Sequence, residues 1–205
     1  MSFSELLSPD QVKLGAQLAS VALSITSIGL LARGDGRGWP LGVAAAMFFG
    51  LVYWLENIQG QAALNVYFLL VQLVGWRRWA TGREPDLRRR ARRLGRREKA
   101  LTVLLWLGAT PLLAGLLGLG RSLHTGLDAF ATVGSLLGQL LMVVGFAESW
   151  LIYLVADVVL VALSAKAELW AYFAMYLVYC ALAWQGWRQW TRDGRPERRN
   201  EVAQT

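Results

Sequence analysis

The chain has 205 residues, a formal net charge of +7 and ten tryptophans, and 55% of its residues are hydrophobic. That hydrophobic share exceeds the ~45–50% of soluble domains and, with the long uncharged stretches described below, indicates a membrane protein. The Lys and Arg residues cluster beside apolar segments without a nucleic-acid-binding motif, so we expect no nucleic acid partner. The single cysteine, Cys180, excludes an internal disulfide and a cysteine-based metal site, and we expect neither metal nor cofactor.

Seven apolar segments follow one another along the chain, and each is about long enough for a helix to cross a hydrocarbon layer ~30 Å thick. Helices are expected because lipid offers no hydrogen-bonding partners to backbone groups. The sequence therefore predicts an all-α integral membrane protein. Its predicted spans are 14–32, 39–55, 60–78, 101–119, 128–147, 150–165 and 168–187.

Charge predicts how these spans are oriented. Eleven Lys and Arg residues lie in 77–99, after the third span, and such clusters are typical of cytoplasmic loops. Counting from that loop, the turn at 33–38 and the basic C-terminal tail also fall inside, which leaves the N-terminus outside. The loops expected outside carry few positive charges: 56–60, 120–126 and 165–168.

The chain repeats itself at an offset of 111 residues. "GWRRWATGREP" begins at Gly75 and "GWRQWTRDGRP" at Gly186, while Trp39 and Trp150 open spans at the same offset. Spans one to three thus resemble spans five to seven, and the fourth span supplies the extra crossing that a second copy in the same orientation needs. Transporters contain parallel repeats of this kind, with substrate bound near the midplane. The alternative is that Gly-Trp-Arg is only a generic interfacial anchor.

The repeat predicts a 3+1+3 architecture, with two three-helix units related by a pseudo-two-fold axis along the membrane normal. The fourth span is the linker between these units. The predicted organisation is 1–79 for the N-terminal region and first repeat, 80–127 for the basic cytoplasmic loop and linker helix, 128–190 for the second repeat, and 191–205 for the basic tail.

Polar and aromatic residues recur at helical spacing in several spans, which places them on one stripe per helix. Such stripes should face protein or water, and together they suit a flat ring bearing hydroxyls. The alternative is that amides and hydroxyls hold helices together, which we favour for Ser20, Ser24, Ser27 and Thr132 and leave open for the amides. The candidate binding residues are Asn65, Phe68, Gln72, Asp128, Gln139, Trp150, Tyr153, Asp157, Tyr172 and Tyr179.

Acidic residues differ in their expected roles. Asp157 alone of the fourteen acids lies well within a span, and an acid at such depth is a functional candidate. Glu148 and Glu168 lie at span ends, where we expect them to be solvated. The spans hold no paired carboxylates and no nucleophile beside a base, so an enzyme is not expected.

Three stretches resemble the Pnu family of bacterial vitamin transporters: "LNVYFLLVQLVGWRRW", "LDAFATVGSLLGQLLMVVGFAESWLIYLVADVVLV" and "GWRQW". Within them, Asp128 opens the fifth span, Glu148 and Trp150 precede the sixth, and Gly186 and Trp190 end the last, as in family members. The resemblance implies a fold similar to the SWEET sugar transporters and a homotrimer in the bacterial inner membrane. It also implies facilitated diffusion of nicotinamide riboside, trapped by a cytoplasmic kinase.

Departures from the family pattern leave the substrate open. The sixth span has Trp150-x-x-Tyr153-x-x-x-Asp157 where nicotinamide riboside carriers often have Trp-x-x-Trp-x-x-x-Asn. Relatives carry thiamine or riboflavin, and an aspartate suits a cation such as thiamine or the pyridinium of nicotinamide riboside. A non-transporting scaffold, whose basic loop binds anionic lipid or a partner, is the alternative from another class.

Overall fold

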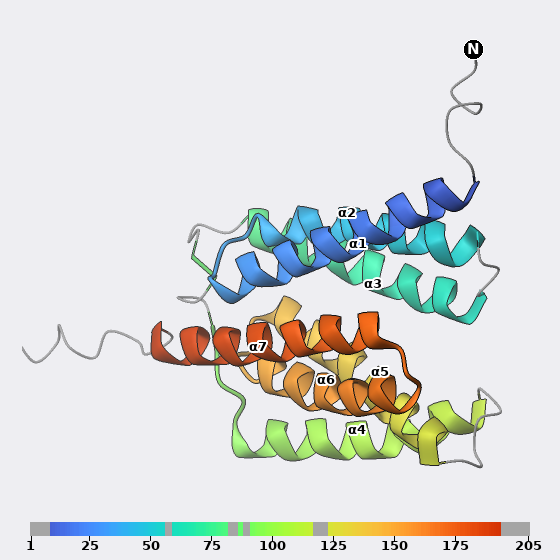
Figure 1. The fold of residues 1–205 in the computed structure, drawn as a ribbon. Helices are drawn as coiled ribbons and strands as arrows, with labels where there is room; N and C mark the ends of the chain where they lie inside the picture. The colour runs from blue at the N-terminus through green and yellow to red at the C-terminus, as the bar shows by residue number, and fades with distance from the viewer. Residues whose placement is uncertain (1–8, 56–58, 82–85, 88–90, 117–122, 194–205) are drawn as a thin grey trace, which may run out of the picture.

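The computed structural model describes residues 9–55, 59–81, 86–87, 91–116 and 123–193, and these residues form seven helices (Figure 1). Most of the C-terminal tail, parts of the basic loop and the loops at 56–58 and 117–122 lie outside this description. The predicted all-α fold with seven helices is confirmed. The helices are α1 (Pro9–Ala32), α2 (Gly38–Leu55), α3 (Gln59–Ala80), α4 (Arg96–Leu116), α5 (Leu123–Val144), α6 (Ser149–Lys166) and α7 (Trp170–Asp193).

Four of these helices, α1, α2, α5 and α6, are long and apolar enough to span a membrane by length and composition alone. The other three carry basic residues near one end, such as Arg77 in α3, Lys99 in α4 and Arg192 in α7. The helices α3 and α7 also carry amides and tyrosines along their length. Their lower hydropathy therefore reflects polar residues that a packed bundle can shield.

The helices form two three-helix bundles. In the first bundle α2 packs between α1 and α3, and in the second α6 packs between α5 and α7, while α4 contacts only α5 among the described helices. The bundles meet where α1 contacts α7 and where α3 contacts α5. Figure 1 shows α1, α3, α5 and α7 running in one direction and α4 in the opposite one. The predicted 3+1+3 parallel repeat is confirmed, because a two-fold axis maps the α1–α7 contact onto the α5–α3 contact.

Two short links have the same backbone conformation: the first link, residues 33–37 between α1 and α2, and the second link, residues 145–148 between α5 and α6. Their glycines Gly34 and Gly145 have φ of 81° and 96°, which favours glycine after a helix. Each glycine carbonyl accepts a hydrogen bond from the loop between α3 and α4 (residues 81–95, the basic loop), from Leu87 at 2.9 Å or Arg92 at 2.8 Å. The repeat is therefore one of structure and extends beyond shared anchor residues.

A layer of buried tryptophans lies at the end of the bundles nearest the basic loop. It consists of Trp39, Trp79, Trp150 and Trp190, and is called the tryptophan layer below. The rings of Trp79 and Trp150 meet Trp190 edge to face, at centroid distances of 6.5 and 5.7 Å. The Trp190 indole N–H donates to the carbonyl of Leu31 at 3.0 Å, which joins the second bundle to the first.

Two glycines allow the helices to approach these rings. A Cβ placed on Gly75 would lie 2.3 Å from the Trp39 ring, and one placed on Gly186 would lie 2.4 Å from the Trp150 ring. Each pair follows the same 111-residue offset. The repeated Gly-Trp-Arg phrase thus has a packing function, because only a residue without a side chain fits between the helix backbone and the ring.

Candidate substrate cavity

A cavity of about 330 Å³ lies between the two bundles. Residues from every helix except α4 line it, and its volume lies within the range of small-molecule sites. The polar stripes therefore converge as their spacing predicted. All ten candidate residues are part of the lining: Asn65, Phe68, Gln72, Asp128, Gln139, Trp150, Tyr153, Asp157, Tyr172 and Tyr179.

The two ends of the cavity differ. Its floor includes Leu31, Met142 and Trp150, which belong to the same buried cluster as the tryptophan layer. At the opposite helix ends the lining residues Asp128 and Tyr172 are exposed. The cavity thus reaches from exposed side chains at one end to a buried floor at the basic-loop end, which includes the Trp150 ring.

Three polar groups near the floor lack hydrogen-bonding partners within the described part of the chain. They are the Gln72 side-chain oxygen Oε1, the Gln139 side-chain nitrogen Nε2 and the Trp150 indole Nε1. The Tyr153 hydroxyl donates to Gln139 Oε1, which leaves the Gln139 amide nitrogen for another acceptor. A buried unpaired polar group costs about 1–3 kcal/mol, so these groups favour a ligand that supplies both donors and acceptors.

The amide and hydroxyl residues also hold helices together. The Asn65 amide donates to the carbonyl of Ala46 at 2.6 Å, joining α3 to α2. Ser27 donates to the carbonyl of Gly38 at 2.7 Å, while Ser20 donates to the carbonyl of Gln17 in its own helix at 2.8 Å. The Ser27 hydroxyl and the Asn65 side-chain nitrogen therefore connect helices, although both residues also line the cavity.

Tyrosines make a hydrogen bond at each contact between the bundles. Tyr179 of α7 and Ser24 of α1 share a hydrogen bond of 2.6 Å. Tyr67 of α3 donates to the carbonyl of Leu136 in α5 at 2.9 Å. These two bonds occupy the α1–α7 and α3–α5 contacts, which are equivalent in the repeat.

Several lining residues were missed from the sequence. Gly42 leaves room for Gln72, because a Cβ at this position would lie 2.6 Å from the Gln72 amide nitrogen. Tyr176 lines the cavity at the repeat offset from Asn65, so the repeat itself was the signal that could have found it. Phe49 and Tyr53, whose stacked rings have centroids 6.1 Å apart, carry no comparable signal.

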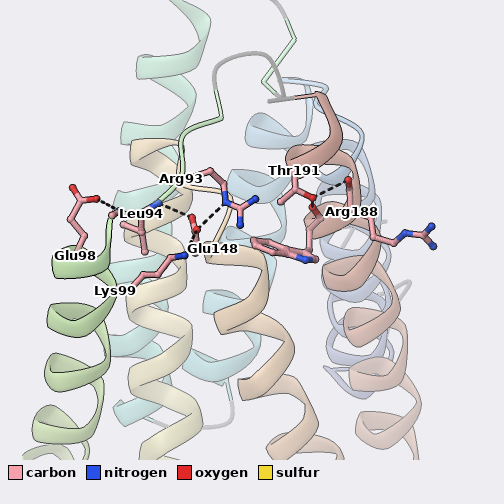
Figure 2. Close-up of polar contacts among 9 residues, drawn as sticks. Arg93, Leu94, Glu98, Lys99, Glu148, Arg188 and Thr191 are labelled. Atoms are coloured by element: carbon pink, nitrogen blue, oxygen red, sulfur yellow. Dashed lines mark hydrogen bonds and ion pairs between the residues drawn. The ribbon is translucent and has the colours of Figure 1, made fainter. Parts of the chain in front are cut away.

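The expectation for Glu148 is wrong, whereas Glu168 is exposed as predicted. Glu148 is buried and accepts hydrogen bonds from the Leu94 N–H at 3.0 Å and from Arg93 Nε at 3.1 Å, with Lys99 Nζ at 3.5 Å (Figure 2). Its burial is stabilised because the basic loop brings Arg93 and a backbone N–H to it, while the start of α4 brings Lys99. Arg93 also stacks over the ring of Trp187 at 4.7 Å, which joins the basic loop to the end of α7.

Comparison with known proteins agrees with this architecture. The model of a family described as nicotinamide mononucleotide transporter matches residues 15–192. The chain belongs to this family. Two relatives are named nicotinamide riboside transporter PnuC: the protein from Neisseria mucosa is 27% identical over 194 residues, which cover 85% of this chain and 72% of the relative. The protein from Haemophilus influenzae is 25% identical over 183 residues, which cover 82% of this chain and 75% of the relative.

The fold also resembles a solved structure, the crystal structure of the vitamin B3 transporter PnuC. The TM-score is 0.71 with 22% sequence identity, and the match covers 88% of this chain and 82% of the other. At that identity the likeness shows the fold. The resemblance noted from the sequence is confirmed, and the chain is a multi-pass membrane protein of a bacterial transporter family.

Proposed function

We propose that the chain carries nicotinamide riboside across the bacterial inner membrane by facilitated diffusion. In this proposal the two bundles rock about the central cavity, α4 links them, and a cytoplasmic kinase phosphorylates the vitamin and traps it inside. The N-terminus lies outside, the basic loop and C-terminal tail lie in the cytoplasm, and three copies assemble as a homotrimer.

One observation carries the proposal: in a cavity between two repeated bundles, the Gln72 oxygen, the Gln139 nitrogen and the Trp150 indole nitrogen are buried and have no partner among the described residues. A nucleoside has hydroxyls for the Gln72 oxygen and the Gln139 nitrogen, and a flat ring for the aromatic lining. The names of the Neisseria and Haemophilus relatives favour nicotinamide riboside over other ligands of that shape. A scaffold has no need for unpaired polar groups in such a cavity.

Thiamine is the second candidate substrate. Asp157 lines the cavity and is buried, and a carboxylate in that position suits the thiazolium cation of thiamine as well as a pyridinium ring. Riboflavin offers a flat ring and hydroxyls but no positive charge. We therefore place nicotinamide riboside first, thiamine second and riboflavin third.

The proposal is tested by calorimetric titration of the purified protein with the three vitamins in parallel. We expect saturable binding of nicotinamide riboside, and we expect Gln72→Ala to weaken it about 10- to 100-fold, because one buried hydrogen bond of roughly 1–3 kcal/mol is lost. Trp150→Ala should weaken binding as well, since it opens the cavity floor. Uptake into proteoliposomes then shows whether binding leads to transport.

The matched control is Thr102→Ala on α4, whose hydroxyl donates to the carbonyl of Glu98 in the same helix and which does not line the cavity. This variant should bind as the parent does. If Gln72→Ala and Trp150→Ala both bind all three vitamins as the parent does, the binding site lies elsewhere. Well-folded protein that binds none of the three would instead support the scaffold interpretation.

A further inference from the structure

We propose that the unpaired carboxylate of Asp157 makes the cavity selective for organic monocations, so that charge decides which flat-ring vitamin is carried. This inference rests on the proposed transport function and narrows its substrate class. It assigns to Asp157 the role of a specificity determinant that separates cationic rings from neutral rings of the same shape.

The position of Asp157 supports this role. Asp157 lies two helical turns beyond Trp150 on α6, or about 10 Å above the cavity floor at 1.5 Å per residue. It lines the cavity and is only 6% exposed. No residue in the described ranges forms a hydrogen bond or an ion pair with its carboxylate. A buried carboxylate without a counter-charge is strongly disfavoured, and a bound cation would supply that charge.

The charges around the cavity also favour a cationic ligand. Asp128 and Asp157 are the only charged side chains among the described lining residues, and both are acidic. No described Lys or Arg lines the cavity, and two arginines at its basic-loop end bind other acids: Arg93 contacts Glu148, and Arg37 contacts Asp35. A cationic ligand is therefore the available counter-ion for Asp157.

Aromatic rings surround the same part of the cavity. Phe68, Tyr153, Tyr176 and Tyr179 are all lining residues. Ring faces attract a cation that has lost part of its hydration, and they also stack on neutral flat rings. Shape and stacking thus admit both kinds of ring, whereas the carboxylate favours only the charged one.

The test compares two ligands that differ in little but charge: nicotinamide riboside, whose pyridinium ring is cationic, and its reduced dihydropyridine form, which is neutral. Calorimetry or competition binding gives the affinity ratio for the parent chain, Asp157→Asn and Asp35→Asn. We expect the parent to prefer the cation, and we expect Asp157→Asn to lower that preference about 10- to 100-fold, because a charged hydrogen-bonded pair is lost. Asp35→Asn, the matched control, removes a carboxylate of the first link that does not line the cavity, and it should preserve the preference.

Each outcome decides the matter. A parent that binds both forms equally, or an unchanged ratio in Asp157→Asn, would overturn the inference. If the parent binds neither form, the proposed nicotinamide riboside transport fails, and thiamine is compared with neutral riboflavin in the same three proteins. If the parent binds thiamine and Asp157→Asn does not, the inference stands with thiamine as the substrate. If the parent binds both vitamins equally, or binds neither, the inference is rejected. The melting temperature and elution volume of Asp157→Asn show that it is folded.

Discussion

The first and second links have the same backbone but use their side chains differently. In the first link Asp35 pairs with Arg37 at 2.6 Å on the surface, where the Arg37 side chain is 83% exposed. In the second link Glu148, at the repeat offset from Arg37, is buried and bound by Arg93, Lys99 and the Leu94 N–H. The side chains of the first link thus pair with each other, whereas the Glu148 side chain of the second link binds the basic loop and the start of α4.

This difference shows which parts of a repeat can diverge. The backbone of both links depends on a glycine with positive φ and on a tryptophan packed against a glycine of another helix, so these residues recur in both halves. The neighbouring side chains have no such constraint. The second link lies beside the start of α4, and there a buried carboxylate is stabilised by backbone and cationic donors.

The largest expected change in stability comes from substitutions that test whether the two halves share their glycine–tryptophan packing. Gly75→Ala and Gly186→Ala each place a Cβ within 2.4 Å of a buried ring that has little room to move. We expect each to lower the free energy of unfolding by about 3 kcal/mol, which denaturation of the purified protein in detergent measures.

Gly108→Ala in α4 is the matched control, since a Cβ there meets nothing within 4 Å. It should leave stability unchanged or raise it slightly, because alanine favours a helix over glycine. A large loss in only one of the two glycine variants would show that the halves are not equivalent in packing.

A smaller effect is expected at the anchor of the second link. Glu148→Ala leaves the buried Leu94 N–H without its acceptor and should lower the free energy of unfolding by about 2 kcal/mol. Hydrogen exchange should also rise at the Leu94 N–H, which distinguishes loss of the anchor from general destabilisation. Exchange at Leu94 equal to that of the parent would contradict the anchoring role.

The smallest effect is expected in the first link. The Arg37 guanidinium, hydrogen-bonded to Asp35, lowers the pKa of that carboxyl below its ordinary value of about 4. Since the folded-state pKa is the lower one, the pair contributes stability above pH ~4 and loses it as pH falls through the lowered pKa. Asp35→Asn should therefore change stability less than Glu148→Ala at neutral pH, and the difference from the parent should vanish in acid. Melting curves of both proteins from pH 7 to pH 3 measure this, and a difference that grows in acid would contradict it.

Much of this protein follows from local patterns in the chain. Apolar length predicted the seven helices, and the Gly-Trp phrases predicted the parallel repeat. Helical spacing placed residues such as Asn65, Gln72 and Asp157 on stripes that meet in one cavity. These inferences succeed because a membrane helix must shield its polar side chains, so the period of its own sequence shows which face is turned inward.

Other features of the site depend on contacts between segments that lie far apart in the sequence. The burial of Glu148 depends on where the basic loop runs, and the space for Gln72 depends on how closely α2 approaches at Gly42. Trp150 was a candidate binding residue, and its ring, which is part of the cavity floor, also packs on Gly186 and meets Trp190. Contacts between segments that lie far apart in the chain decide these three features, and the periodicity of a single helix carries no information about such contacts.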